Sequence, residues 1–313
     1  MQIPPELTRS LEALLEGVPR KELAAAAARI SAGFRQGKTS QPIATPLQAT
    51  AYAVARMPAT FAACAAVCSR LAEVLPEFAP QSLLDVGAGT GAASWAAVTQ
   101  WPKIASVTML DRNPALTALA RRLAAAGPLA KAEFLAGDLS VQGPKADLVV
   151  ASYVLAEFPE EQSASVALDL WRSAGSALAL VEPGTPDGFA RIRKVRAALI
   201  QAGAHVAAPC THDRDCPMRD GDWCHFSQRL PRSRDHMLLK DAQVPFEDER
   251  YSYVVVTREK VASGARILAP PLEEKPGLTF KLCDENGLRA QFVAARDKEE
   301  YRRVRKLGWG DLF

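Results

Sequence analysis

The chain has 313 residues, of which 48% are hydrophobic and 23% charged, a composition typical of globular proteins. Its formal net charge of +3 excludes a strong overall attraction to nucleic acid or to a membrane surface, so RNA contacts must come from local basic patches. The sequence starts without a basic segment followed by an apolar run, and no uninterrupted apolar stretch reaches about 18 residues. We therefore expect a cytoplasmic protein with no membrane partner, and we expect a monomer.

The pattern of apolar residues divides the chain into three regions. Residues 1–78 predict a helical region, with amphipathic runs at 7–15 and 22–34. Residues 79–208 alternate short apolar runs with longer amphipathic ones, which predicts an α/β domain with a mostly parallel sheet. Residues 209–313 change to cysteine, proline and charge, followed by β-like segments. The strands expected in the last two regions are 83–86, 107–110, 132–135, 148–152, 178–181, 251–257, 279–282 and 289–294.

A glycine-rich turn follows the first predicted strand and leads into a helix. It reads Leu84-Asp85-Val86-Gly87-Ala88-Gly89-Thr90-Gly91. Glycines at such a turn let backbone N–H groups approach a nucleotide-like ligand without obstruction by side chains. Because Gly87, Gly89 and Ala92 also satisfy the relaxed dinucleotide fingerprint, the glycines alone do not identify the ligand.

Carboxylates at the ends of three predicted strands favour S-adenosylmethionine (SAM). Asp85 precedes the turn, where a negative charge opposes a pyrophosphate but suits the cationic methionine end of SAM. Asp111 falls twenty residues after Gly91 and can accept both ribose hydroxyls, and Asp138 can accept the adenine amino group. Because parallel strands end at one edge, these acids converge on one crevice. The predicted cofactor site comprises Asp85, Gly87, Gly89, Gly91, Asp111, Asp138, Leu139 and Ser152.

The turn Asp85-Val86-Gly87-Ala88-Gly89-Thr90-Gly91 resembles the first motif of class I SAM-dependent methyltransferases. The resemblance implies a Rossmann-like, seven-stranded sheet with SAM across its edge, so residues 79–208 become a SAM-binding, methyltransferase-like domain. Many RNA-base methyltransferases carry an Asn or Asp, two prolines and an aromatic residue after the fourth strand. Residues 151–158 lack that signature. Tyr153 and Glu157 are candidates to line an acceptor pocket, with packing and helix-start roles as the alternatives, and no catalytic residue is assigned.

The six cysteines fall into separate groups. Cys64 and Cys68, at helical spacing among alanines, are expected to be small buried helix residues. Cys210, Cys216 and Cys224 have the spacing C-x5-C-x7-C in a stretch too polar to fold by burial, where a metal centre would supply the ordering energy. A later strand is expected to bring back a fourth thiolate. The predicted ligands are Cys210, Cys216, Cys224 and Cys283, with His212 and His225 in reserve, and the metal is zinc or an iron–sulfur cluster.

Several local strings resemble one family, the methyltransferase-like assembly factors of the mitochondrial small ribosomal subunit and their bacterial relatives. The strings are at 55–60 (Ala-Arg-Met-Pro-Ala-Thr), 181–185 (Val-Glu-Pro-Gly-Thr), 222–229, 247–253 and 305–312. The resemblance implies a SAM-binding fold, association with small-subunit ribosomal RNA during assembly, and a 4Fe-4S cluster. Cys210, Cys216, Cys224 and Cys283 match the cluster positions, which favours iron–sulfur over zinc in the cysteine-rich, β-rich region 209–313.

Two basic stretches are candidate contacts for ribosomal RNA or an immature small subunit. They contain Arg229, Arg232 and Arg234 with Lys240, and Arg302 and Arg303 with Arg305 and Lys306; a solvated charged face is the alternative. The sequence thus supports an enzyme that methylates small-subunit ribosomal RNA or a non-catalytic assembly factor that retains the SAM pocket. A small-molecule methyltransferase is less favoured, because the basic, cysteine-rich region would have no purpose there.

Overall fold

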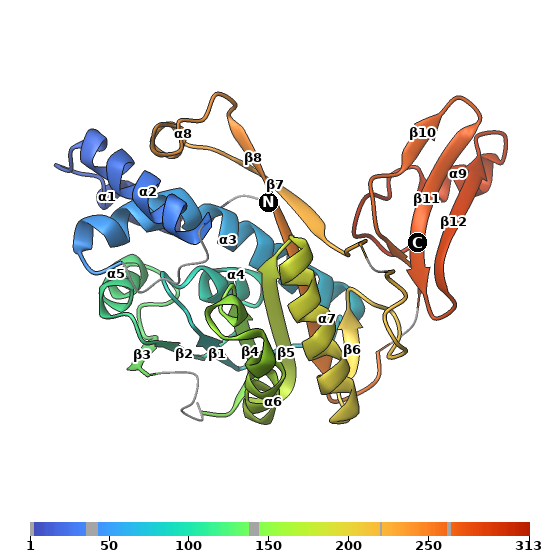
Figure 1. Cartoon of the computed structure of the whole chain (residues 1–313), viewed down its shortest axis with the longest axis horizontal. Coiled ribbons are helices and arrows are strands. Elements are labelled where there is room, and N and C mark those ends of the chain that lie inside the picture. Colours follow the sequence, from blue (N-terminus) through green and yellow to red (C-terminus); the bar gives the residue numbers. More distant parts are fainter. Residues whose placement is uncertain (1–2, 36–42, 138–143, 220, 262–263) are drawn as a thin grey trace.

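The computed structural model describes residues 3–35, 43–137, 144–219, 221–261 and 264–313 (Figure 1). In these ranges the chain forms a main sheet of eight strands and a second sheet of four. Helices cover both faces of the main sheet, and the second sheet stands to one side of it (Figure 1). The predicted α/β class with a mostly parallel sheet is confirmed.

The main sheet has the strand order β3-β2-β1-β4-β5-β8-β6, with β7 pairing to β8. Its first five strands are parallel, whereas β8 runs antiparallel to its neighbours β5, β6 and β7. The strands are β1 (Ser82–Val86), β2 (Ser106–Asp111), β3 (Glu133–Ala136), β4 (Ala146–Ser152), β5 (Ala174–Pro183), β6 (His205–Ala208), β7 (Phe226–Pro231) and β8 (Phe246–Thr257). Since β7 and β8 belong to this sheet, the sheet continues beyond residue 208, where the sequence placed a boundary.

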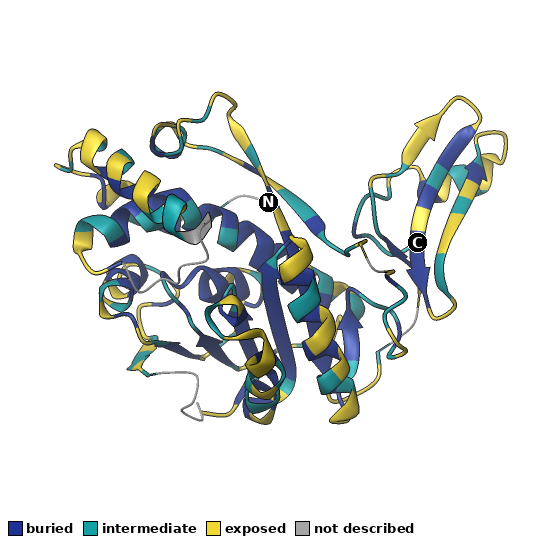
Figure 2. Ribbon diagram, viewed as in Figure 1, coloured by how far each residue is buried: buried dark blue, intermediate teal, exposed yellow. Residues whose placement is uncertain are grey.

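Neighbouring residues of the parallel strands face two separate cores. Leu83 packs in the core beneath the first helix layer, whereas Leu84 packs in the core on the opposite face. Both cores are buried, which explains why the strands read as nearly continuous apolar runs (Figure 2). The first layer contains α3 (Pro46–Val74), α4 (Ala92–Gln100) and α5 (Pro114–Ala124), and the second contains α6 (Ser163–Ser173) and α7 (Pro186–Gln201).

The N-terminal region is helical, as predicted, with α1 (Pro5–Ala13), α2 (Arg20–Arg35) and the long α3. A capping box starts α3: the Thr45 hydroxyl accepts the backbone N–H of Gln48, and the Gln48 side chain accepts that of Thr45. Among the described residues, α3 has the length and hydropathy of a membrane span, but 83% of its most apolar window is buried inside the structure. That burial matches a core helix packed on the sheet.

The C-terminal region contributes to both sheets. A hairpin of β7 and β8 carries α8 (Arg234–Leu239) at its tip and projects beyond the sheet toward the N-terminal helices (Figure 1). The second sheet pairs β11 with three strands and is accompanied by a short helix. These elements are β9 (Arg266–Ile267), β10 (Leu272–Glu274), β11 (Gly277–Asp284), β12 (Gly287–Ala294) and α9 (Lys298–Val304).

The fully buried Arg266 fastens the second sheet to the body of the protein. Its guanidinium donates to the carbonyl oxygens of Pro209 and Gly310, each at 2.9 Å, and lies 3.3 Å from the Glu73 carboxylate at the end of α3. A buried charge is tolerated only when it is paired and hydrogen-bonded, so these partners belong together. Arg266 therefore holds α3, the segment before Cys210 and the C-terminal residues in one arrangement.

Candidate functional site

The glycine turn follows β1 and requires glycine at defined positions. Gly87, Gly89 and Gly91 all have positive φ, at 68°, 55° and 82°. A Cβ on Gly87 would lie 2.5 Å from the side chain of Val154, and one on Gly91 would lie 3.2 Å from the Met109 sulfur. The turn is thus closely packed against the loop that follows β4.

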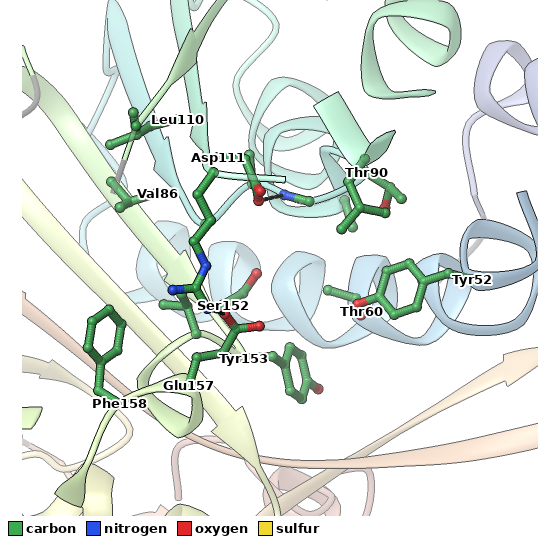
Figure 3. Close-up of a pocket in the computed structure, with 18 residues that line it drawn as sticks. Tyr52, Thr60, Val86, Thr90, Leu110, Asp111, Ser152, Tyr153, Glu157 and Phe158 are labelled. Carbon is green, nitrogen blue, oxygen red and sulfur yellow. Dashed lines mark hydrogen bonds and ion pairs between the residues drawn. The ribbon is translucent and has the colours of Figure 1, made fainter. Parts of the chain in front are cut away.

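A pocket opens beside this turn at the carboxyl ends of β1, β2 and β4 (Figure 3). It is the edge at which the sequence predicted a crevice. Of the predicted cofactor residues, Gly87, Gly89, Asp111 and Ser152 line the pocket. Asp138 and Leu139 lie outside the described residues, although the neighbouring Gly137 lines the pocket.

The Asp111 carboxylate lies against the turn. One of its oxygens accepts the Gly89 N–H at 2.6 Å, and the other accepts the Asn113 N–H at 2.7 Å. Burial raises the pKa of Asp111, and these two N–H bonds act in the opposite direction. Because each carboxylate oxygen has two lone pairs, the group retains capacity to accept ligand hydroxyls from the pocket side.

The structure places Asp85 differently from the sequence-based expectation that it faces the methionine end of a ligand. Its side chain is fully buried and is not among the groups lining the pocket. One carboxylate oxygen accepts both the N–H and the hydroxyl of Ser94, at 3.0 and 2.7 Å, so Asp85 joins β1 to α4 behind the turn. Burial raises its pKa to about 6. Gly91 also lies outside the pocket lining, as the residue that caps the start of α4.

The loop after β4 forms the wall opposite Asp111. Tyr153 has a left-handed backbone conformation with φ of 58°, and its hydroxyl donates to the Glu249 carboxylate on β8 at 2.9 Å. A short 3₁₀ helix, η1 (Leu155–Glu157), follows, and the buried Glu182 carboxylate on β5 accepts the Leu155 N–H at 2.9 Å. Tyr153 and Glu157, the two candidates for lining an acceptor pocket, both line this pocket beside the glycine turn.

Other residues of the pocket were not singled out from the sequence. Tyr52 and Thr60 on α3 line it (Figure 3). Arg112 also lines the pocket, and its guanidinium lies 2.7 Å from the Glu157 carboxylate. Glu182 on β5, which supports the wall through Leu155, was not singled out either, although a charged residue within a buried apolar run is a signal that could have found it. One side of the pocket is formed by the Asp111 carboxylate and the backbone of the glycine turn, and the other side carries the rings of Tyr52 and Tyr153. This combination of a few polar groups with aromatic surface suits a nucleoside-like ligand.

The four predicted metal ligands line a second, mostly apolar cavity. Cys210, Cys216 and Cys224 of the segment between β6 and β7 line it with Cys283 of β11, together with Arg196 and Arg266. Burial, reinforced by the neighbouring cysteines, raises the pKa of Cys224 well above its usual value and that of Cys283 to about 12. In the described part of the chain, no group of three or more His, Cys, Asp or Glu residues is arranged to hold a metal ion. The metal centre therefore stays a prediction.

The other two cysteines and the two reserve histidines have different surroundings in the structure. Cys64 and Cys68 are buried in α3, as expected. His212 lies beside the cavity, with its Nε2 atom 3.8 Å from the Cys283 sulfur, whereas the His225 ring stacks on Trp223. His212 is thus the better placed of the two reserve ligands.

Carboxylates engage most of the predicted RNA-binding arginines. Arg229 makes two bonds of 2.8 Å to Asp248, Arg232 lies 3.4 Å from Glu247, and Arg303 lies 2.7 Å from Glu300. Arg234 and Arg302 are exposed, and no carboxylate of the described residues lies within ion-pair distance of them. The positive surface is consequently smaller than the arginine count suggests.

Replacing Glu182 by glutamine should change how stability depends on pH. Burial raises the pKa of Glu182 from 4.5 to about 7, so the folded state binds its proton more tightly than the unfolded state. The free energy of unfolding should therefore fall between about pH 5 and pH 7, by about 3 kcal/mol at most, and Glu182→Gln should reduce this fall. Urea unfolding across this range tests it, with the exposed Glu161→Gln as control. An undiminished fall in the Glu182 variant would assign the effect to another group.

The chain resembles members of one protein family over most of its length. The family model described as mitochondrial small ribosomal subunit Rsm22 matches residues 46–313. The human mitochondrial ribosome assembly protein METTL17 is 29% identical over 257 residues, covering 75% of this chain and 55% of that protein. The mitochondrial Rsm22-cox11 tandem protein 2 of Schizosaccharomyces pombe is 28% identical over 295 residues, covering 74% and 38%. The chain thus spans about half the length, or less, of these curated relatives.

A solved structure with a similar arrangement is the magnesium protoporphyrin IX methyltransferase of Synechocystis PCC 6803 with bound SAH. It is 16% identical to this chain, with a TM-score of 0.42, and the similarity covers 64% of this chain and 84% of the other.

Proposed function

Because this chain belongs to the Rsm22 family of the mitochondrial small ribosomal subunit, we propose that it is a SAM-binding assembly factor acting on the small ribosomal subunit. The match over residues 46–313, which includes the pocket and both sheets, carries this proposal. The name of the human relative, a ribosome assembly protein, supports it. The partner in the proposal is small-subunit ribosomal RNA or an immature small subunit, contacted by a protein that acts as a monomer in the cytoplasm.

The first element of the proposal is SAM in the pocket beside the glycine turn. Asp111 would accept the ribose hydroxyls, and the backbone of Gly87 and Gly89 would approach the ligand without side chains in the way. SAM itself supplies an activated methyl group on a sulfonium ion. The buried acids near the pocket suit that positive charge, since Asp85 lies directly behind the turn.

Substitutions at the turn should weaken SAM binding. Asp111→Asn removes the negative charge that would accept the ribose and should weaken affinity at least about tenfold, and Gly89→Arg should block the pocket. Isothermal calorimetry with SAM and SAH measures both effects. Asp147→Asn is the matched control, because Asp147 also accepts two backbone N–H groups, but at the opposite end of β1. Equal affinity of the Asp111 and Asp147 variants would show that the pocket has been misplaced.

The second element is contact with RNA phosphates through the exposed arginines. Arg234 lies on α8 at the hairpin tip and Arg302 lies on α9, so each can reach a phosphate without first leaving a carboxylate partner. Arg229, Arg232 and Arg303 belong to the same two stretches and can join after exchanging their partners for phosphates.

Charge reversal should identify the RNA surface. Arg234→Glu and Arg302→Glu should each weaken binding of small-subunit ribosomal RNA and reduce the salt slope by about one unit for each phosphate that the variant no longer binds. Filter binding between low and physiological salt measures the slope. Arg122→Glu on α5 makes the same charge change on an exposed residue away from both stretches. Identical slopes for all three variants would remove these stretches from the interface.

The third element is a 4Fe-4S cluster, with zinc as the alternative, on the cysteine cavity. Cys210, Cys216 and Cys224 of one segment line this cavity with Cys283 of β11, and burial raises the pKa values of Cys216, Cys224 and Cys283, so a cation would help to hold these three as thiolates. The residues therefore fit a thiolate-bound group in their chemistry. Such a group would order the polar segment between β6 and β7, which has little apolar material of its own.

Oxygen-free purification separates the alternatives. Iron and acid-labile sulfide with brown colour are expected, whereas a zinc site would be colourless and free of sulfide. Cys216→Ser and Cys283→Ser should lose the iron, and Cys68→Ser, in the core helix α3, should keep it. If Cys283→Ser keeps full iron while Cys216→Ser loses it, His212 becomes the fourth ligand.

Methyl transfer is a separate step of the proposal. The Tyr52 and Tyr153 rings beside the pocket favour a role in accepting a substrate, but no side chain there forms the Asn- or Asp-Pro-Pro pattern of RNA-base methyltransferases. Incubation with radiolabelled SAM and immature small subunits decides between an enzyme and a binding protein. Label in the RNA makes the chain an enzyme, and binding without label makes it a non-catalytic assembly factor.

A further inference from the structure

Tyr153 stands in a conformation that its own backbone does not favour. A residue with a bulky side chain and φ of 58° is uncommon and persists only where its surroundings hold it. Here the Tyr153 N–H donates to the Val181 carbonyl at 2.7 Å, and its hydroxyl donates to Glu249 at 2.9 Å. Both ends of the residue are therefore fixed by neighbouring strands.

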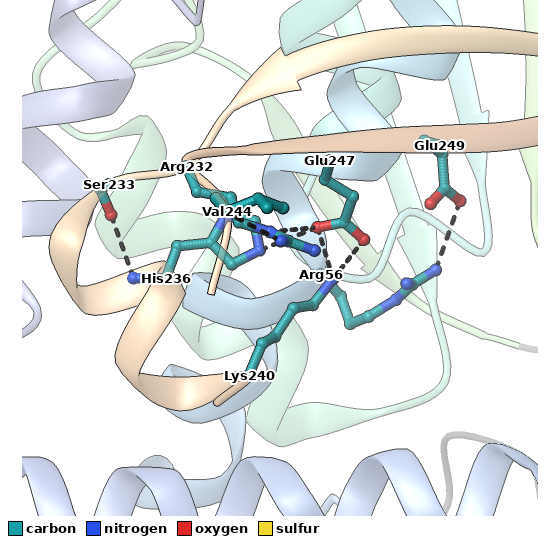
Figure 4. A network of polar contacts seen from close by, with 8 residues as sticks. All are labelled: Arg56, Arg232, Ser233, His236, Lys240, Val244, Glu247 and Glu249. Carbon is teal, nitrogen blue, oxygen red and sulfur yellow. Dashed lines mark hydrogen bonds and ion pairs between the residues drawn. The ribbon is translucent and has the colours of Figure 1, made fainter. Parts of the chain in front are cut away.

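Glu249 in turn is paired with a cation from the other side of the pocket. The Arg56 guanidinium of α3 lies 3.5 Å from the Glu249 carboxylate, whose side chain is only 10% exposed (Figure 4). Arg56 lies one helical turn from Tyr52 and one from Thr60, so the three residues share one face of α3. Tyr52 and Thr60 line the pocket directly, and Arg56 reaches Tyr153 through Glu249.

Glu247, a second acidic residue on β8, contacts a different part of the molecule. Glu247 lies two residues before Glu249, on the same face of the strand, and is engaged by Arg232, His236 and Lys240 of the hairpin (Figure 4). Those contacts stabilise the hairpin tip and do not involve the pocket-lining residues. The hydrogen bonds and ion pairs of Glu247 thus hold the hairpin tip, and those of Glu249 hold the wall of the pocket.

We propose that Glu249 and Arg56 are positioning residues of the SAM pocket, which hold Tyr153 in its left-handed conformation so that the wall is formed before the ligand arrives. This inference rests on the proposed SAM binding and names the residues that prepare the site. A pocket formed in advance binds more tightly, because the ligand does not have to order the wall. The Tyr153 hydroxyl is turned toward β8, so its ring is the part presented to the pocket (Figure 3).

A double-mutant cycle tests the inference. Tyr153→Phe and Glu249→Met each remove the same hydrogen bond, so each should weaken SAM binding about tenfold, and the double variant should bind no more weakly than either single one. Glu249→Gln keeps an acceptor and should restore most of the affinity. Glu247→Gln, the matched control, should loosen the hairpin and leave SAM affinity unchanged. Calorimetry supplies these affinities.

Hydrogen exchange in the ligand-free protein gives a readout that does not depend on SAM. Backbone amides of residues 153–157 should exchange faster in Tyr153→Phe and Glu249→Met than in the wild type, but not in Glu247→Gln. A wild type that binds no SAM would overturn the proposed function. A wild type that binds SAM, with unchanged affinity or unchanged exchange in the two variants, would overturn the positioning role alone.

Discussion

The antiparallel pairing of β8 with β5 and β6 is the contact on which the rest of the structure depends. β8 is twelve residues long; its buried part from Tyr251 to Thr257 pairs with β5 along its whole length, and residues 255–257 also pair with β6 on the other side. A strand between two others has its backbone groups paired on both sides, so its register is firmly set. The first half of the same strand pairs with β7, and it carries Glu247 to the hairpin tip and Glu249 to Tyr153 in the wall of the pocket.

Buried carboxylates lie around the pocket, and hydrogen bonds from backbone amides offset the free-energy cost of removing these carboxylates from water. Asp85 and Glu182 are both fully buried, with pKa values raised to about 6 and about 7, and the pKa of Asp111 is also raised. Each accepts N–H groups from the first residues of a helix or turn, where the helix dipole favours negative charge. The acids therefore connect strands to the helices and loops that form the pocket.

Local features of the sequence were sufficient to predict the five parallel strands, β8, the glycine turn and the place of Asp111, whereas β6 and β7 were not among the expected strands. Each depends on neighbours within a few residues, such as the positive φ that Gly87 and Gly89 need. The burial of Asp85 behind the turn was not predicted, because its contact is with Ser94 on the next helix. Glu249 and Arg56 escaped prediction since their partners lie almost a hundred residues or more away.

Pairing across a hairpin explains why the arginine stretches were harder to interpret. Whether Arg229 is free depends on Asp248, which faces it only in the register of β7 against β8. By contrast, the approach of Cys283 to the other three cysteines was expected from the strand at 279–282 and from the family resemblance, and all four cysteines line one cavity. The spacing of the cysteines does not decide between an iron–sulfur cluster and zinc, and the bound group remains a prediction.

Helix α3 connects the pocket to the C-terminal part of the molecule. Tyr52 and Arg56 serve the pocket and its wall, whereas Arg70 and Glu73, about 25 Å further along the helix, bind Asp311 and Arg266 of the C-terminal part. A displacement of α3 along its axis would therefore disturb the wall of the pocket and the attachment of the C-terminal part together.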